Sequence, residues 1–176
     1  TASFGHGITT TLLQLAKAYS IVVNGGYQIK PKLVKNNNNE KKEKILSQDL
    51  SREILPILRK IVSTKDGTAS LANVNGYEIG GKTGTAEKSA DGEYSNKKIN
   101  SFVSVFPTSK PKFVLAVMLD EPKINENYIY HYRDGSNIKY KGTPFNTAGW
   151  TTVEATGQIV EKIGPILATK YSEFNF

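Results

Sequence analysis

Hydrophobic residues recur at the spacing of an α-helix in two stretches near the start of the chain. The first covers residues 9–24, with threonines available as caps before it and Gly25-Gly26 as a stop. The second runs from Ser47, a capping residue, to about Ser63, and Pro56 inside it is expected to bend or interrupt it. The apolar positions that define the two faces are Leu12, Leu15, Ala16, Tyr19 and Val23, then Leu50, Ile54, Ile57, Leu58 and Ile61.

Further along, the pattern changes to short, strand-like apolar runs. Three strands are predicted, at Tyr77–Thr85, Ile99–Phe106 and Phe113–Asp120. The proline-flanked loop 107–111 between the last two is short enough for an antiparallel hairpin. Earlier in the chain we expect an edge or irregular strand at Tyr27–Lys35, an exposed loop at 36–44 and a short helical stretch at 68–73.

The C-terminal part begins with a long polar segment. Residues 121–142 are rich in Asn, Tyr and Gly and predict a loop, whose tyrosines we expect to cover the edge of the sheet. Thr143-Pro144 predicts a helix start, and the helix should run towards Lys162, with Pro165 ending or kinking it. The fold class is therefore α+β, a three-stranded antiparallel sheet with about three helices covering it.

Composition narrows the classes of function. The 176 residues carry 23 Lys and Arg against 16 Asp and Glu, a net charge of +7. We interpret this charge as a solvated lysine-rich surface and expect no nucleic-acid partner, because no RNP motif, zinc finger or basic aromatic stripe is present. With no cysteine and two isolated histidines, His6 and His131, we expect no disulfide, no metal site and no cofactor.

Lys82-Thr83-Gly84-Thr85 is the stretch with the clearest chemistry. A Lys-Thr-Gly triplet alone is a weak signal, but this one ends a predicted strand and precedes an antiparallel hairpin. The period of two places Thr83 and Thr85 on one side of the strand and Lys82 on the other. An ordinary exposed lysine and two threonines on a strand would explain the same local pattern.

Further segments are informative together with this strand, and they cover nearly the whole chain. They are Ser3-Phe4-Gly5-His6-Gly7, residues 11–19, Asn24-Gly25-Gly26 with Pro31, Gly67-Thr68-Ala69, residues 80–86, Ser101-Phe102 and Asp120-Glu121-Pro122. In these residues and in their order, the chain resembles the class B penicillin-binding proteins, most closely the septal, cell-division transpeptidases.

The resemblance implies the C-terminal part of a β-lactamase/transpeptidase-like domain. The strand 82–85 would bind the peptidoglycan stem peptide or a β-lactam, with the Thr83 and Thr85 hydroxyls at its carboxylate and Gly84 leaving room for its backbone. The Thr85 backbone N–H would be an oxyanion donor, and Lys82 would add positive charge. The parent enzyme would act in a division complex at the periplasmic face of the bacterial cytoplasmic membrane, while this piece would be soluble.

The chain departs from the family in the catalytic motifs. Family members use a serine nucleophile in S-x-x-K, assisted by S-x-N. No S-x-N occurs here, and the three S-x-x-K matches all follow the Lys-Thr-Gly motif instead of preceding it. We therefore expect no nucleophile in this chain, and we interpret residues 1–176 as a partial transpeptidase domain that is inactive alone. The dismissed matches begin at Ser95, Ser109 and Ser136.

Two alternatives remain open. The chain could act as a non-catalytic binding or assembly module, forming a homo-oligomer through an unpaired edge at the strand 113–120. It could also be part of a serine β-lactamase or penicillin sensor, which shares the Lys-Thr-Gly strand. The segment Asn125 to Gly142 is longer than the family's loop at this place, and the sequence does not reveal its purpose.

Overall fold

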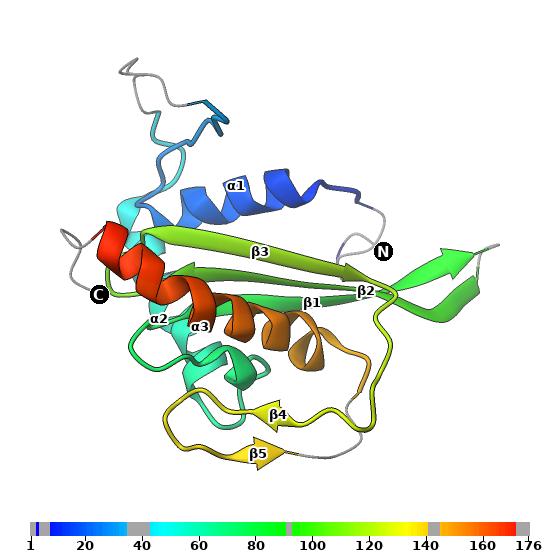
Figure 1. Cartoon of the computed structure of the whole chain (residues 1–176). Helices are drawn as coiled ribbons and strands as arrows, with labels where there is room; N and C mark the ends of the chain where they lie inside the picture. Colours follow the sequence, from blue (N-terminus) through cyan, green and yellow to red (C-terminus); the bar gives the residue numbers. More distant parts are fainter. Residues whose placement is uncertain (1–2, 4–7, 35–42, 91–92, 141–144, 172–176) are drawn as a thin grey trace.

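The fold is a three-stranded antiparallel sheet with helices on both faces, seen in a computed structural model that describes residues 3, 8–34, 43–90, 93–140 and 145–171. The strands are β1 (Gly80–Ala90), β2 (Glu93–Phe106) and β3 (Phe113–Asp120), in the order β1-β2-β3. Helices α1 (Leu12–Val23) and α2 (Gln48–Ser63) pack on one face, and α3 (Thr152–Lys170) crosses the other (Figure 1). The predicted α+β class is confirmed.

Alternation along β2 explains why both faces are covered. Phe102 and Phe106 point towards α3 and are fully buried there, whereas Val105 points to the opposite face and packs with Leu58 of α2 and Val23 of α1. A strand that is apolar on both sides requires cover on both sides, which α3 and the α1–α2 pair provide. The core on the α3 side also contains Val62, Ala69, Leu71, Ala72, Val74, Ile79, Tyr130, Val153 and Val160.

The first two helices begin where the sequence predicts. Thr11 caps α1 in a capping box with Gln14, and Ser47 caps α2 by accepting from the Leu50 N–H. Pro56 lies inside α2, and of the expected bend or interruption, the interruption does not occur. The short helical stretch is confirmed as the 3-10 helix η2 (Ser70–Ala72).

Several predicted boundaries were wrong. β1 and β2 extend past their apolar cores into the polar residues 86–90 and 93–98, where ladder pairing between backbones needs no hydrophobic side chain. In the described part of the strand expected at 27–35, one bridge forms, between Tyr27 and Lys44. No neighbouring strand among the described residues pairs with it, and Pro31 lacks a backbone N–H. Most of the loop predicted at 36–44 lies outside the described residues.

The last helix also differs from the prediction. It begins at Thr152, after the 3-10 helix η3 (Ala148–Trp150), and it continues through Pro165 to Lys170. The predicted start at Thr143-Pro144 lies outside the described residues. None of the described helices is long and apolar enough to cross a membrane.

The segment 121–140 is more ordered than a plain loop. It contains the two-residue strands β4 (Tyr130–His131) and β5 (Lys139–Tyr140), which pair with each other. The expected cover of the sheet edge is not what the ring contacts show, because the rings of Tyr130 and Tyr140 both pack on Trp150 of η3. This segment therefore packs against η3 and bonds to α3.

Glycine allows α3 to lie close to the segment that precedes β1. A Cβ on Gly157 would lie 2.6 Å from the Leu71 carbonyl oxygen, which is backbone and cannot turn aside. One on Gly164 would lie 2.4 Å from the Tyr77 ring. The absence of side chains at these two positions sets the distance between α3 and residues 71–77.

We predict that Gly157→Ala destabilises the protein although alanine is the better helix former. Helix propensity alone would add about 1 kcal/mol to the free energy of unfolding. The clash with Leu71 should outweigh this gain and give a net loss of about 1–3 kcal/mol, measured by urea unfolding. The matched control is Gly164→Ala, whose neighbour is a side chain that can rotate and which should cost less. A stabilised Gly157→Ala variant would show that the Leu71 backbone moves freely.

Candidate functional site

The Lys-Thr-Gly-Thr strand lies at an edge of the sheet. β1 is the first strand in the order β1-β2-β3, and its outer edge has no strand partner among the described residues. Thr83 is opposite Phe102 in the ladder and Thr85 is opposite Asn100, both of which face α3. The two threonines therefore project on the same side, as the period of two predicts, while Lys82 and Gly84 project on the other.

Each of the two threonine hydroxyls contacts a segment from elsewhere in the chain. The Thr83 Oγ1 lies 3.3 Å from the Thr68 Oγ1, and the Thr85 Oγ1 accepts a hydrogen bond from the Ala148 backbone N–H at 3.0 Å. Thr68 and Ala148 belong to adjoining segments, because a Cβ on Gly149 would lie 2.8 Å from the Thr68 carbonyl oxygen. The site is thus formed by β1, the turn before η2 and the turn that becomes η3.

The hydroxyl of Thr85 has one of its two lone pairs occupied as a result. A hydroxyl has one proton to donate and two lone pairs that accept. Because the Ala148 N–H occupies one lone pair, the proton is left for an acceptor on the open side of the strand. Thr85 is exposed and Thr83 is half-buried, so an acceptor arriving from solvent can reach both.

Lys82 and Gly84 lie on the opposite face of β1. The Lys82 Nζ donates to the Thr83 carbonyl oxygen at 2.8 Å and is exposed. A Cβ on Gly84 would lie 2.7 Å from the Ser101 Oγ, so the close approach found at this glycine is to β2. Lys82 therefore adds positive charge at the strand without touching the two threonine hydroxyls.

Three of the other segments noted in the sequence meet around this strand. Gly67-Thr68-Ala69 reaches Thr83, Ser101-Phe102 pairs with Gly84 and Thr83, and the Asp120-Glu121 pair binds Lys88 of β1. These last contacts are exposed ion pairs, at 2.6 Å to Asp120 and 2.9 Å to Glu121. Residues 4–7, including His6, lie outside the described residues.

None of the three S-x-x-K matches has the geometry of a nucleophile with a base. Ser95 and Lys98 lie in β2, where its pairing with β1 is irregular, and not one turn apart on a helix. Ser109 lies in the loop between β2 and β3, and Ser136 in the turn between β4 and β5. None of them lies at a helix start, where the lysine would be one turn from the serine.

No group of three or more histidine, acidic or cysteine side chains that could hold a metal ion occurs within the described ranges. His131 is exposed in β4. The residues around Thr83 and Thr85 are hydroxyl and backbone groups, which suit recognition of an anion through hydrogen bonds.

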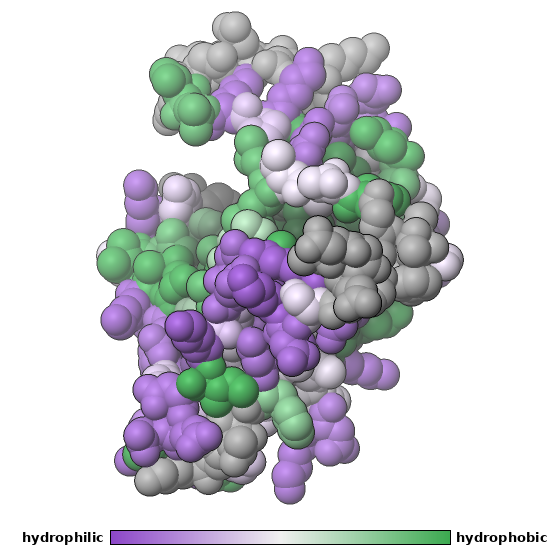
Figure 2. All heavy atoms as spheres, turned by 90° about the vertical axis from the view of Figure 1, so that its right-hand side faces the viewer, coloured by the Kyte–Doolittle hydropathy of each residue, from purple (hydrophilic) through white to green (hydrophobic). Residues whose placement is uncertain are grey.

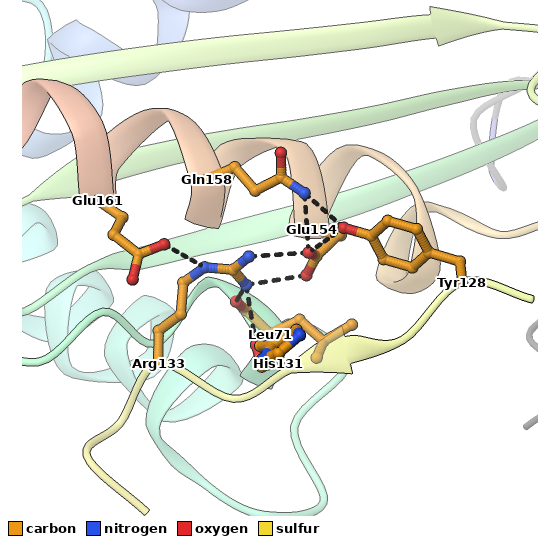
Figure 3. A network of polar contacts seen from close by, with 7 residues as sticks. All are labelled: Leu71, Tyr128, His131, Arg133, Glu154, Gln158 and Glu161. Atoms are coloured by element: carbon orange, nitrogen blue, oxygen red, sulfur yellow. Dashed lines mark hydrogen bonds and ion pairs between the residues drawn. The ribbon is translucent and has the colours of Figure 1, made fainter. Parts of the chain in front are cut away.

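A buried ion pair lies behind the site. Arg133, from the turn after β4, makes two hydrogen bonds to Glu154 of α3, at 2.8 and 2.9 Å, and both side chains are only 6% exposed (Figure 3). Arg133 also donates to the carbonyl oxygen of Leu71 in η2 at 3.1 Å. It therefore ties together η2 and α3, the elements next to Thr68 and Ala148.

The carboxylate of Glu154 has three partners. Burial alone would raise the pKa of Glu154, but hydrogen bonds from Arg133, Gln158 and Tyr128 outweigh this and hold the pKa below its ordinary value. Burial, and then the hydrogen bond to Glu154, raise the pKa of Tyr128 to about 12. At neutral pH Glu154 is therefore ionised and Tyr128 is protonated.

The sequence predicted the Lys-Thr-Gly-Thr strand but not the residues that contact its threonines or stabilise the elements around it. Thr68 was noted only as part of a matching segment, and Ala148 was placed inside the predicted helix from 143. A threonine and a glycine in the stretch Thr147-Ala148-Gly149-Trp150 are a poor helix start, and this was the available signal. Arg133 gave no signal, since its partner is 21 residues away.

The comparisons with known proteins identify the family. The family model of the penicillin-binding protein transpeptidase domain matches residues 1–138. The chain belongs to the penicillin-binding protein transpeptidase family. It is 33% identical over 179 residues to the probable peptidoglycan D,D-transpeptidase FtsI of Caulobacter vibrioides, covering 96% of this chain and 28% of that protein. It is 37% identical over 136 residues to the stage V sporulation protein D of Bacillus subtilis, covering 70% of this chain and 21% of that protein.

Solved structures support the same membership for the fold. The transpeptidase domain of penicillin-binding protein 3 from Burkholderia pseudomallei superimposes with a TM-score of 0.74 at 28% identity. The match covers 97% of this chain and 46% of that one. This transpeptidase-family chain thus spans less than half of that domain and about a quarter of the two curated relatives.

We predict that Arg133→Met lowers the free energy of unfolding by about 3–5 kcal/mol, because it leaves Glu154 buried without its cation. The double variant Arg133→Met with Glu154→Leu should recover most of this loss, since no buried charge remains. Glu161→Gln is the matched control. Its carboxylate also bonds Arg133 but is 59% exposed, and its loss should cost about 0–1 kcal/mol.

Urea unfolding as a function of pH gives a second check. Because the folded-state pKa of Glu154 is depressed, its contribution is present above the pKa of the unfolded state and disappears as pH falls through the folded-state pKa. The double variant should lack this acid step. A double variant as unstable as Arg133→Met would show that the charges are not the cause.

Proposed function

We propose that this chain supplies the Lys-Thr-Gly half of the active site of a peptidoglycan D,D-transpeptidase, whose serine nucleophile comes from a segment outside these residues. The observation that carries the proposal is the pair of threonine hydroxyls at the open edge of β1, with Thr85 oriented by the Ala148 N–H. Family membership and the names of the relatives support transpeptidation as the reaction class. No cofactor takes part in this proposal.

The substrate would bind as an added strand. A stem peptide ending in D-Ala-D-Ala would lie along the outer edge of β1, with its carboxylate at the Thr83 and Thr85 hydroxyls. The Thr85 backbone N–H would stabilise the oxyanion that forms on the attacked carbonyl. Lys82, on the other face of the strand, would add positive charge towards the nucleophile's side.

The reaction would be acyl transfer in two steps. The serine oxygen forms an ester with the penultimate D-Ala carbonyl, the amide bond breaks, and the terminal D-Ala leaves with the proton on its amine. An amine of a second stem then attacks the ester, and the serine recovers its proton. A β-lactam would stop at the first step, because its opened ring stays attached to the serine.

The location and partners follow from the same proposal. Cross-linking of stem peptides places the parent enzyme at the periplasmic face of the cytoplasmic membrane, and the relative named FtsI makes a division complex the expected setting. A serine β-lactamase or penicillin sensor is the less favoured assignment, because the relatives reported above include named transpeptidases.

The test is acylation by a fluorescent penicillin, followed by intact mass. The chain alone should give no adduct. When a separately produced segment with the S-x-x-K and S-x-N motifs is added, the adduct should appear on that segment, and it should form more slowly with Thr85→Val. The control is the motif-bearing segment alone. An adduct on this chain would show that Ser95, Ser109 or Ser136 is a nucleophile and would overturn the proposal.

A second candidate function is assembly through β3. Its outer edge has no strand partner among the described residues, and Met118 and Leu119 near its end are 50% and 37% exposed. Figure 2, which faces the far end of the β1–β2 hairpin, shows hydrophilic residues gathered at the centre with hydrophobic residues to either side. The open, partly apolar outer edge of β3 can pair with a second copy of the chain.

This candidate predicts a mass that rises with protein concentration in light scattering. Leu119→Lys should abolish the rise, because a charge at an edge strand opposes strand pairing. Leu33→Lys is the matched control, since Leu33 is fully exposed and lies outside the sheet. A monomer mass at every concentration would remove assembly as a function.

A further inference from the structure

Helix α3 begins differently from the other two long helices. Thr11 and Ser47 stand at the starts of α1 and α2 in extended backbone conformation, with ψ of 156° and 151°, and each caps its helix. Thr151 holds the same position before α3, but its ψ is −80° and its side chain makes no capping hydrogen bond. A threonine at this position normally caps the helix, but the Thr151 hydroxyl makes its hydrogen bonds elsewhere.

That hydroxyl joins two other parts of the molecule. The Thr151 Oγ1 donates to the Thr147 carbonyl oxygen at 2.9 Å and accepts from the Asn100 Nδ2, also at 2.9 Å. Thr147 and Thr151 thus close the turn that contains η3, and Asn100 fixes this turn to β2.

Asn100 is an unusual residue for its place. It is fully buried in the middle of the sheet, and its Oδ1 has no hydrogen-bond partner among the described residues. A hydrophobic side chain would normally be favoured there, because a buried polar atom without a partner is costly. What distinguishes the position is that Asn100 lies directly opposite Thr85 in the β1–β2 ladder.

The contacts close into a ring around Thr85. The Asn100 Nδ2 donates to the Thr151 Oγ1, which in turn donates to the Thr147 carbonyl oxygen. The residue after Thr147 is Ala148, whose N–H donates to the Thr85 Oγ1. The ladder between Thr85 and Asn100 completes the ring. A shift of the turn would therefore move the N–H that orients the Thr85 hydroxyl.

We infer that Thr151 and Asn100 are positioning residues that aim the Thr85 hydroxyl at the substrate carboxylate. The inference rests on the proposed function, since the carboxylate is part of that proposal. Neither residue touches the substrate. Both act through the Ala148 N–H, which occupies one lone pair of the Thr85 hydroxyl and leaves its proton for the carboxylate.

The test uses the whole chain and two measurements by NMR. The first is hydrogen exchange of the Ala148 amide, and the second is titration with N-acetyl-D-Ala-D-Ala, followed at the amides of Thr83 and Thr85. Thr151→Val keeps the shape of the side chain and removes both hydrogen bonds. It should expose the Ala148 amide to faster exchange and weaken binding about fivefold, the effect of one misdirected hydrogen bond.

Two further variants make the result specific. Thr151→Ser keeps the hydroxyl and should restore both the slow exchange and the binding. Asn100→Ala removes the donor to the Thr151 hydroxyl and leaves the sequence of α3 unchanged. It should also speed Ala148 exchange and weaken binding, and it remains informative if Thr151→Val folds poorly.

Thr156→Val is the matched control for ordinary loss of stability. Thr156 is a buried threonine of α3 whose hydroxyl donates to the Thr152 carbonyl oxygen of the same helix and makes no hydrogen bond to the η3 turn itself. It should shift the urea midpoint but leave Ala148 exchange and ligand binding unchanged.

The outcomes separate the two proposals. If the wild-type chain binds the ligand and both Thr151→Val and Asn100→Ala bind it equally well, the positioning inference is wrong while the proposed function stands. If Ala148 exchange is unchanged in these variants, the ring does not hold the turn and the inference is also wrong. If the wild-type chain gives no shift at Thr83 and Thr85, the proposed carboxylate recognition fails, and the inference fails with it.

Discussion

The close approach of α3 to residues 67–77 is the constraint on which the rest of the structure depends. Gly157 brings the helix against the Leu71 carbonyl, and Gly149 brings the turn before it against the Thr68 carbonyl. A side chain at either position would separate these elements. Their contact places Thr68 beside Thr83 and Ala148 beside Thr85. The site therefore depends on two segments, far apart in the sequence, that meet next to β1.

Polar groups, as well as hydrophobic packing, hold that meeting in place. The buried pair Arg133–Glu154 joins η2 to α3, and its desolvation is offset by a bidentate geometry and by further partners at Gln158 and Tyr128. Such a pair adds less to stability than an apolar contact of the same size could, but its hydrogen bonds permit one arrangement only. In this chain that arrangement fixes the elements that support the Lys-Thr-Gly strand, which gives the long segment after β3 a structural purpose.

The sequence predicted the parts of the fold whose signals are local. The capping residues Thr11 and Ser47 and the strand Phe113–Asp120 lie where expected, because caps and alternating apolar runs act over a few residues. α3 starts later than predicted, because residues 148–150 form η3 and the Thr151 hydroxyl bonds Asn100 of β2. The polar extension of β1 and β2 was missed because backbone pairing leaves no mark in the side-chain pattern.

The sequence by itself determined the family, the α+β class and the side of the strand to which Thr83 and Thr85 point, because motif order and a period of two are properties of the chain alone. Only the tertiary structure decided what each hydroxyl meets. The Ala148 N–H lies 63 residues from Thr85, and the Thr151 hydroxyl 51 residues from Asn100. Hydrogen bonds of this kind depend on how α3 packs on the sheet, and no local pattern encodes the distance between two elements that meet only after folding.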